Sequence, residues 1–208
     1  WCGANLTAER CESRPQGPHR NLHPSESRKR AKEKQTPTKR GRHRMQISNV
    51  TFAEIAIGDT ATYTRLITNQ EVEAFAAISG DHNPLHLDPE YATTTAFGEC
   101  IAHGMLTGAL ISAAIAMQLP GPGSVYLSQN LQFRAPVFLG DILTVTLEVT
   151  NKHGKRPWVT LDCTVENQEG KAVAKGEAQV AAPTEKETVT VVPPPAIQLL
   201  EEAALASD

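Results

Sequence analysis

The sequence is poor in cysteine and lacks a long hydrophobic run. Its cysteines include no CxxC pair of the kind that binds zinc or forms a redox centre; they are Cys2, Cys11, Cys100 and Cys163. We therefore expect free, reduced thiols and a cytoplasmic protein. No apolar stretch resembles a signal peptide or reaches the ~20 residues of a membrane span, so we expect no membrane association.

Acidic residues are scarce in the first 44 positions, and basic residues are scarce in the rest. Residues 1–44 contain 12 Lys or Arg against 4 Glu, a net charge of +8, whereas residues 45–208 contain 8 basic against 19 acidic residues, a net charge of −11. The first region also lacks apolar periodicity, so we expect a disordered basic tail. Its basic runs could contact nucleic acid. We expect no nucleic-acid partner, because Trp1 in first place and Met45 at the change of composition favour upstream or vector-derived sequence.

The chain length of 208 residues suits one ordinary domain. We expect that domain over residues 45–183, where the apolar patterns lie. Residues 184–208 contain a run of three prolines and are typical of a linker or tail with a weak terminal helix.

The first half of the domain predicts a strand, a helix and a polar loop. Residues 59–67 alternate as a strand does, and residues 68–80 predict a helix that starts in a capping box and stops at a glycine. A polar loop over residues 81–88 follows, and an Asp-Pro pair predicts a short helix over residues 88–95. The apolar positions of the first helix are Val72, Phe75, Ala76 and Ile78.

The second half predicts one hydrophobic helix and then strands. Residues 104–119 are almost free of charge, and a helix apolar on nearly all sides must be buried. Strand patterns joined by short turns follow, which indicates an antiparallel sheet; they cover residues 125–133, 142–150, 158–165 and 172–180. We therefore expect an α+β fold in which an antiparallel sheet wraps around a long buried helix. The open edge of such a sheet predicts a homodimer.

The segment most suggestive of chemistry is SGDHNPLH, residues 79–86. Asp81 and His86 lie five residues apart in a loop that Pro84 stiffens. A carboxylate and an imidazole aimed at one small volume can hold and polarise a water molecule. From the residues alone, Asp81 could instead bind backbone amides, and His86 could be a core histidine.

This segment resembles the motif of MaoC-like (R)-specific enoyl-CoA hydratases. The resemblance continues through Tyr91-Ala92, the run AHGM at residues 102–105, and the runs PGPGSVYLSQNLQF and PVFLGD, and so covers about residues 47–183. It implies a single hot-dog fold, a homodimer, and reversible syn-hydration of a trans-2-enoyl-CoA to an (R)-3-hydroxyacyl-CoA. Such a reaction serves fatty acid metabolism or polyhydroxyalkanoate synthesis and needs no metal or other cofactor.

The resemblance also implies roles for single residues. Asp81 and His86 would be the catalytic pair that binds the water, with Asn83 in support. Gly104 would offer its backbone N–H, at the positive end of the long helix, to the thioester oxygen. The remaining positions would contact the acyl-CoA substrate or shape its pocket: Ser112, Ile115 and His103.

Alternatives remain at this level. A hot-dog acyl-CoA thioesterase would use the same carboxylate and water to cut the thioester, and a non-catalytic acyl-CoA-binding module would use neither. Four residues of the loop, Asp81, His82, His86 and Asp88, could ligate a metal only if they faced one point. The run VAAPTEK, residues 180–186, is similar to the end of the hydratase domain in bifunctional enoyl-CoA hydratase/phosphate acetyltransferase proteins.

Overall fold

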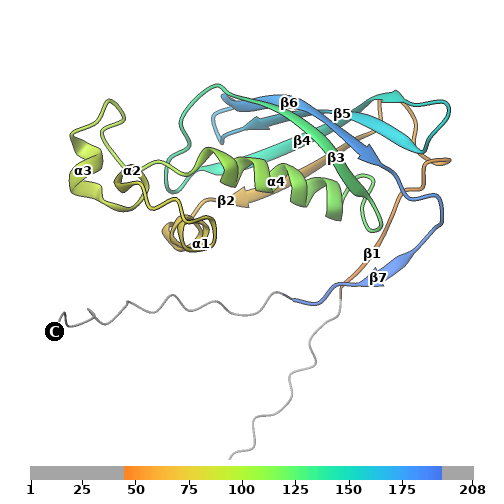
Figure 1. Ribbon diagram of the computed structural model, residues 1–208, viewed down its shortest axis with the longest axis horizontal. Coiled ribbons are helices and arrows are strands. Elements are labelled where there is room, and N and C mark those ends of the chain that lie inside the picture. The colour runs from red at the N-terminus through yellow and green to blue at the C-terminus, as the bar shows by residue number, and fades with distance from the viewer. Residues whose placement is uncertain (1–44, 194–208) are drawn as a thin grey trace, which may run out of the picture. The chain divides into compact units, whose positions relative to one another are not determined.

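The computed structural model describes residues 45–193, in which one long helix lies against a five-stranded antiparallel sheet (Figure 1). The sheet order is β2-β4-β5-β6-β3, and each neighbouring pair is antiparallel. The long helix is α4 (Gly104–Met117). The strands are β2 (Thr60–Leu66), β3 (Val125–Phe133), β4 (Ile142–Lys152), β5 (Trp158–Glu166) and β6 (Ala172–Ala181). The predicted α+β fold is therefore confirmed.

The core lies between α4 and the three middle strands. Every second residue of a strand points to the same face, and on β4, β5 and β6 these residues are aliphatic or small. They pack against the sheet-facing side of α4, so that most of them have no solvent exposure. The cluster includes Val145, Leu147, Leu161, Val165, Val180, Ile111 and Ala114.

Three short helices gather near the N-terminal end of α4 (Figure 1). They are α1 (Asn69–Ser79), α2 (Pro84–Leu87) and α3 (Pro89–Thr93). Helix α1 starts in the predicted capping box at Thr68 and stops at Gly80, as predicted. Helix α2 lies inside the segment predicted as a loop, and Ile78, one of the apolar positions of the first predicted helix, is exposed.

A separate two-stranded ribbon joins the two ends of the described chain. β1 (Gln46–Ser48) pairs antiparallel with β7 (Thr188–Thr190), which lies in the segment expected to be a linker. No local pattern predicts this pairing, because the partners are far apart in sequence. The predicted basic tail, residues 1–44, and the predicted terminal helix lie outside the described residues.

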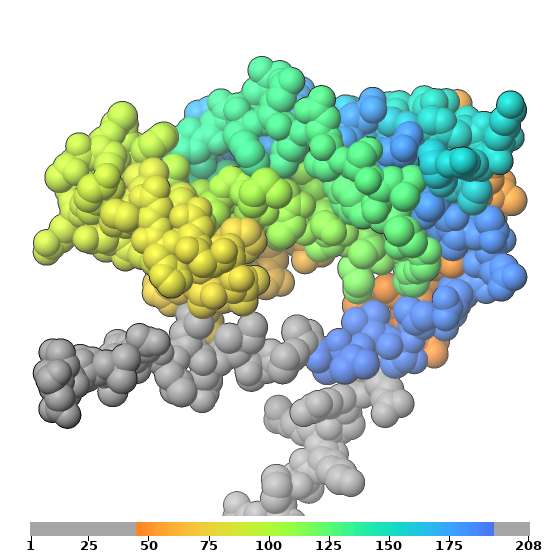
Figure 2. All heavy atoms as spheres, viewed as in Figure 1, coloured from red at the N-terminus to blue at the C-terminus, as the bar shows by residue number. Residues whose placement is uncertain are grey.

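Helix α4 is buried on one side and exposed on the other in the single chain. Its sheet-facing residues are buried, as predicted for a core helix. Its outer side reaches the surface next to β3 (Figure 2) and carries Met105, Ala109, Ser112 and Ala116. Within residues 45–193 no helix, α4 included, has the length and apolar character needed to cross a membrane.

Candidate active site

Local caps shape the segment that carries Asp81 and His86. Gly80 ends α1 in the left-handed conformation, with φ of 77°, which glycine adopts without strain. The side chain of Asn83 then accepts a hydrogen bond from the N–H of Leu85 at 3.0 Å and caps α2, which carries His86. The position of His86 is therefore fixed by a cap two residues after Asp81.

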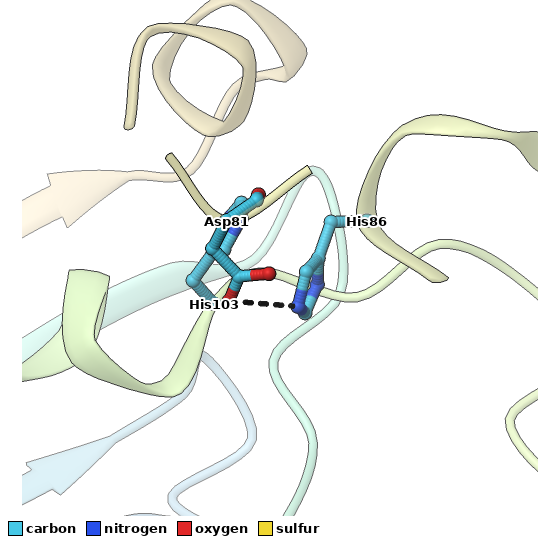
Figure 3. A group of neighbouring side chains, drawn as sticks. All are labelled: Asp81, His86 and His103. Atoms are coloured by element: carbon cyan, nitrogen blue, oxygen red, sulfur yellow. Dashed lines mark hydrogen bonds and ion pairs between the residues drawn. The ribbon is translucent and has the colours of Figure 1, made fainter. Parts of the chain in front are cut away.

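The carboxylate of Asp81 faces the imidazole of His86 (Figure 3). The atoms Oδ2 of Asp81 and Nε2 of His86 lie 4.0 Å apart, too far for a direct hydrogen bond. Nδ1 of His86 lies 2.7 Å from the carbonyl oxygen of Ile101, and since a carbonyl only accepts, Nδ1 carries the proton. In the neutral ring Nε2 therefore has a lone pair directed toward a carboxylate. A water that donates one hydrogen bond to each acceptor holds them about 4 to 5 Å apart.

Asp81 also makes the backbone contact that the simpler interpretation of the sequence expects. Its Oδ1 accepts a hydrogen bond from the N–H of Asn83 at 3.3 Å. This contact orients the carboxylate and leaves the other oxygen, Oδ2, toward His86. The two interpretations of Asp81 are therefore compatible.

His103 touches both members of the pair. Its Nε2 lies 3.0 Å from the backbone carbonyl oxygen of Asp81, and its ring stacks on that of His86 with the centroids 3.8 Å apart. The side chain is 2% exposed, and its Nδ1 has no hydrogen-bond partner among the described residues. In the described structure His103 braces the Asp81–His86 pair, and its predicted role in contacting substrate or shaping the pocket stays a prediction.

A cavity of about 360 Å³ lies beside His86. It is lined by His86 but not by Asp81, so the imidazole is the member of the pair that faces the cavity. The first residue of α4, Gly104, also lines it. Most of its walls are apolar: Phe97, Ile101, Phe133, Pro136, Val137 and Val173.

Gly104 lies where a backbone donor can reach the contents of this cavity. As the first residue of α4 it has an N–H without an acceptor inside the helix, at the positive end of the helix dipole. The ring of Phe133 lies so close that a Cβ at position 104 would be 3.1 Å from its Cζ. A glycine at this position therefore allows close packing of β3 over the helix start.

Ser112 and Ile115 do not line the cavity of the single chain. Ser112 lies on the exposed side of α4, and Ile115 is buried in the core against the sheet. The structure thus brings together Asp81, His86 and His103, places Gly104 in the same cavity as His86, and leaves Ser112 and Ile115 apart from them. Their role in binding an acyl chain stays a prediction.

Most of the cavity residues were not predicted as site residues, among them Thr107, Phe133 and Arg134. Thr107 and Phe133 are part of ordinary apolar patterns, which carry no sign of a functional role. Arg134 could have been singled out from the sequence, because it is the one Lys, Arg, Asp or Glu between positions 100 and 140.

The set of possible metal ligands differs from the one that the sequence suggested. Asp81, His86 and His103 offer ligand atoms within 4.8 Å of one another, whereas His82 and Asp88 are not part of this group. Asp88 caps α3 through the N–H groups of Glu90 and Tyr91. Nε2 of His103 donates to the carbonyl of Asp81, which leaves Nδ1, without a hydrogen-bond partner among the described residues, as its free acceptor beside those of Asp81 and His86.

Neither cysteine of the described residues is suited to act as a nucleophile. Burial, followed by the charges of Asp88 and Glu99, raises the pKa of Cys100 above its usual value. Burial raises the pKa of Cys163 to about 12. A thiol with a raised pKa carries little of the reactive thiolate at neutral pH.

Comparison with known proteins identifies the family of this site. Residues 52–171 match the family described as MaoC like domain, a span that includes the Asp81–His86 pair and most of the cavity. The chain belongs to the MaoC-like domain family. The R-hydratase PhaJ1 from Pseudomonas aeruginosa, solved in the unliganded form, is 52% identical to this MaoC-like domain. The TM-score is 0.72, with 74% of this chain and 99% of that chain covered. This likeness agrees with the predicted hot-dog fold.

Two curated relatives of the MaoC-like domain are similar over nearly their whole length. The (R)-specific enoyl-CoA hydratase of Aeromonas caviae is 46% identical over 129 residues, which cover 62% of this chain and 96% of that protein. The (R)-specific enoyl-CoA hydratase of Rhodospirillum rubrum is 42% identical over 134 residues, which cover 64% of this chain and 91% of that protein.

Proposed function

We propose that this protein is an (R)-specific enoyl-CoA hydratase, a hydro-lyase that adds water reversibly across the double bond of a trans-2-enoyl-CoA. The observation that carries the proposal is the pair of acceptors, Oδ2 of Asp81 and Nε2 of His86, held 4.0 Å apart beside a cavity that also contains Gly104. The names of the two curated relatives support the same activity.

In this mechanism the bound water donates one hydrogen to Asp81 and the other to His86. Its oxygen attacks the β-carbon, so that the C–O bond forms as an O–H bond breaks and the proton passes to Nε2 of His86. The electron pair of the double bond moves through the α-carbon to the thioester oxygen. The imidazolium then returns the proton to the α-carbon from the same face, and Asp81 remains a carboxylate that stabilises the imidazolium.

The backbone N–H of Gly104 binds the thioester oxygen as it becomes negative. It can do so because it has no acceptor within α4 and because the helix dipole favours negative charge there. Loss of one such donor typically costs about 3 to 4 kcal/mol of barrier. Asn83 acts at a distance from the reacting atoms, by capping the helix that carries His86.

His103 supports the pair as a positioning residue. It holds the backbone of Asp81 by a hydrogen bond and the ring of His86 by stacking, so its loss loosens both sides of the water site. Ser112, on the exposed side of α4, would limit the acyl chain once that side is covered, whereas Ile115 faces the sheet and its contact with the acyl chain stays a prediction.

The working molecule is a homodimer in this proposal. β3 is one of the two edge strands of the sheet, and large apolar side chains are exposed on it and on the outer side of α4: Met105 (61%), Val125 (58%), Leu127 and Phe133 (51%). A second copy would cover this patch and pair the open edge. Leu127→Lys should convert the dimer to a monomer in sedimentation velocity, whereas Ile57→Lys, a change at an exposed apolar residue outside the patch, should leave it dimeric.

The cellular setting is proposed from the same chemistry. The free thiols Cys100 and Cys163 suit a reducing compartment, in agreement with a cytoplasmic enzyme. The product, an (R)-3-hydroxyacyl-CoA, suits polyhydroxyalkanoate synthesis or, in the dehydration direction, fatty acid metabolism. The domain limits of 45–183 and the relation to bifunctional hydratase/phosphate acetyltransferase proteins stay predictions.

The test is hydration of crotonyl-CoA. Loss of the ultraviolet absorbance of the conjugated thioester, without release of free thiol, supports hydration, and oxidation of the product by an (R)-specific 3-hydroxyacyl-CoA dehydrogenase supports the stereochemistry. Release of thiol at the rate of absorbance loss would show a thioesterase instead, and the proposal would then be abandoned.

A further inference from the structure

Arg134 is a single charge in a long neutral stretch. Between positions 100 and 140 there is no other Lys or Arg and no Asp or Glu. This stretch supplies α4, β3 and most of the cavity walls. No acidic residue nearby in the sequence can neutralise the charge of Arg134. Any anionic partner of Arg134 must therefore come from elsewhere.

The guanidinium of Arg134 has no ion-pair partner among residues 45–193. Two other basic residues of this region do have one, since Arg65 pairs with Glu71 and Lys186 with Glu54. The backbone of Arg134 is fixed, since its N–H donates to the carbonyl of Val173 at 2.8 Å, but its side chain is exposed. The backbone of Arg134 is therefore held in place, while its guanidinium is free to bind an anion.

This charge belongs to the same cavity as the catalytic groups. Arg134 lines the cavity together with His86 and Gly104, and it follows Phe133, whose ring lies over Gly104. Of the Lys and Arg residues that the structure describes, it is the one on the cavity wall. The cavity thus contains the groups proposed to act on the thioester, His86 and Gly104, and one cationic side chain, that of Arg134.

We infer that Arg134 binds the phosphate at the end of the pantetheine arm of the substrate, an inference that rests on the proposed function. A guanidinium binds phosphate oxygens through two parallel, charge-assisted hydrogen bonds. The need for a local cation is clear, because residues 45–193 carry 16 acidic against 8 basic residues and repel a polyanionic substrate. The same phosphate occurs in CoA and in the prosthetic group of acyl carrier proteins.

The experiment compares crotonyl thioesters of CoA, of phosphopantetheine and of pantetheine, the last of which has no phosphate. Arg134→Ala should raise KM about 10- to 100-fold for the first two, the range expected for one charge-assisted contact. The kcat should change far less, because the contact is made equally in the ground and transition states. Arg134→Lys should recover a large part of the loss. The difference between Arg134→Ala and the unchanged protein should vanish with the pantetheine thioester.

A matched control is Lys155→Ala, which removes the same charge at the β4–β5 turn, outside the cavity. It should leave KM for crotonyl-CoA unchanged. Two results for Arg134→Ala would overturn the inference: an equal rise of KM with all three thioesters, or no rise of KM with any of them. A rise with the CoA thioester alone would also overturn it, since the contact would then be to another phosphate of CoA.

The two sources of the phosphate are separated by the unchanged protein. The substrate with the higher kcat/KM, crotonyl-CoA or a crotonyl-carrier protein, identifies the source of the phosphate. Arg134→Ala should lower kcat/KM for that substrate. If the unchanged protein hydrates none of the thioesters, the proposed function fails. Calorimetric binding of CoA itself, weaker for Arg134→Ala than for Lys155→Ala, still tests Arg134 in that case.

Discussion

In the sheet, β4, β5 and β6 bury aliphatic side chains such as Val145, Leu161 and Val180 completely and pair along their whole length. In the helical segment, residues 69–104, each short helix is capped and buries only one or two side chains, such as Val72 and Ala92. Asp81 in this segment is 54% exposed in its side chain, whereas the partner His86 is 11% exposed. The sheet thus supplies stability and the helical segment supplies chemistry, and changes in the two regions should be separable.

The largest effect is expected from the catalytic pair. Asp81→Asn and His86→Ala should each lower kcat for crotonyl-CoA by about 10³-fold, since the first removes the carboxylate charge beside the water and the second removes the base that takes its proton. The melting temperature should stay nearly unchanged for Asp81→Asn, whose side chain is half-exposed, and should fall by a few degrees for His86→Ala, which loses a nearly buried ring. His82→Ala, a change at an exposed residue of the same turn, serves as the control and should keep full turnover. A variant of the pair that loses stability in proportion to activity would break the comparison.

The converse result is expected from the core of the sheet. Leu161→Ala should lower the free energy of unfolding by about 3 kcal/mol, through lost burial and the cavity that remains. Urea unfolding followed by circular dichroism measures this change. At a temperature where the variant is folded, kcat should remain near that of the unchanged protein. A large loss of kcat in fully folded Leu161→Ala would show that the core positions the site more directly than the contacts indicate.

Gly104→Ala tests the point where the two regions meet. The added Cβ would press on the ring of Phe133 at 3.1 Å and shift the N–H that faces the thioester. We expect kcat/KM to fall about tenfold, a part of the loss that follows removal of a whole oxyanion donor. Phe133→Leu in the same chain should restore activity by making room. If the double variant is no better than Gly104→Ala, the contact with Phe133 does not set the position of the donor.

The smallest effect is expected from the cap of α1. Thr68→Ala removes the side-chain acceptor for the N–H of Glu71 and should destabilise the protein by about 1 kcal/mol. Hydrogen exchange should speed up in α1 before it does in β5, because the cap acts locally. Thr68→Ser keeps the acceptor and should behave as the unchanged protein. Equal acceleration in α1 and β5 would mean that the two regions open together.

Local signals explain why much of the fold could be predicted from the sequence. The capping box at Thr68 and the glycine at position 80 lie within the helix they delimit, so α1 was predicted with its true ends. Helix α2 was missed because four residues show no periodicity, and its start depends on the cap at Asn83. β7 was missed because its partner, β1, lies at the other end of the described chain.

In the site, too, the local features could be predicted from the sequence and the contacts across the fold could not. The spacing of Asp81 and His86 indicates a shared target, since both lie in one short segment. Their bracing by His103 depends on a contact across the fold, and a ring stacked at 3.8 Å leaves no trace in the sequence. Periodicity also does not distinguish a helix buried on all sides from one that its sheet buries on one side, which explains why the exposed side of α4 was not foreseen.

The β1–β7 ribbon has a consequence for the engineering of this protein. Because Gln46 pairs with Thr190 and the N–H of Val191 donates to the carbonyl of Met45, the described chain begins and ends at the same place. A short peptide could join these ends, and new termini could be opened at the β4–β5 turn near Gly154, far along the chain from Asp81 and His86. Such a circular permutant would keep every catalytic residue on an unbroken stretch of chain.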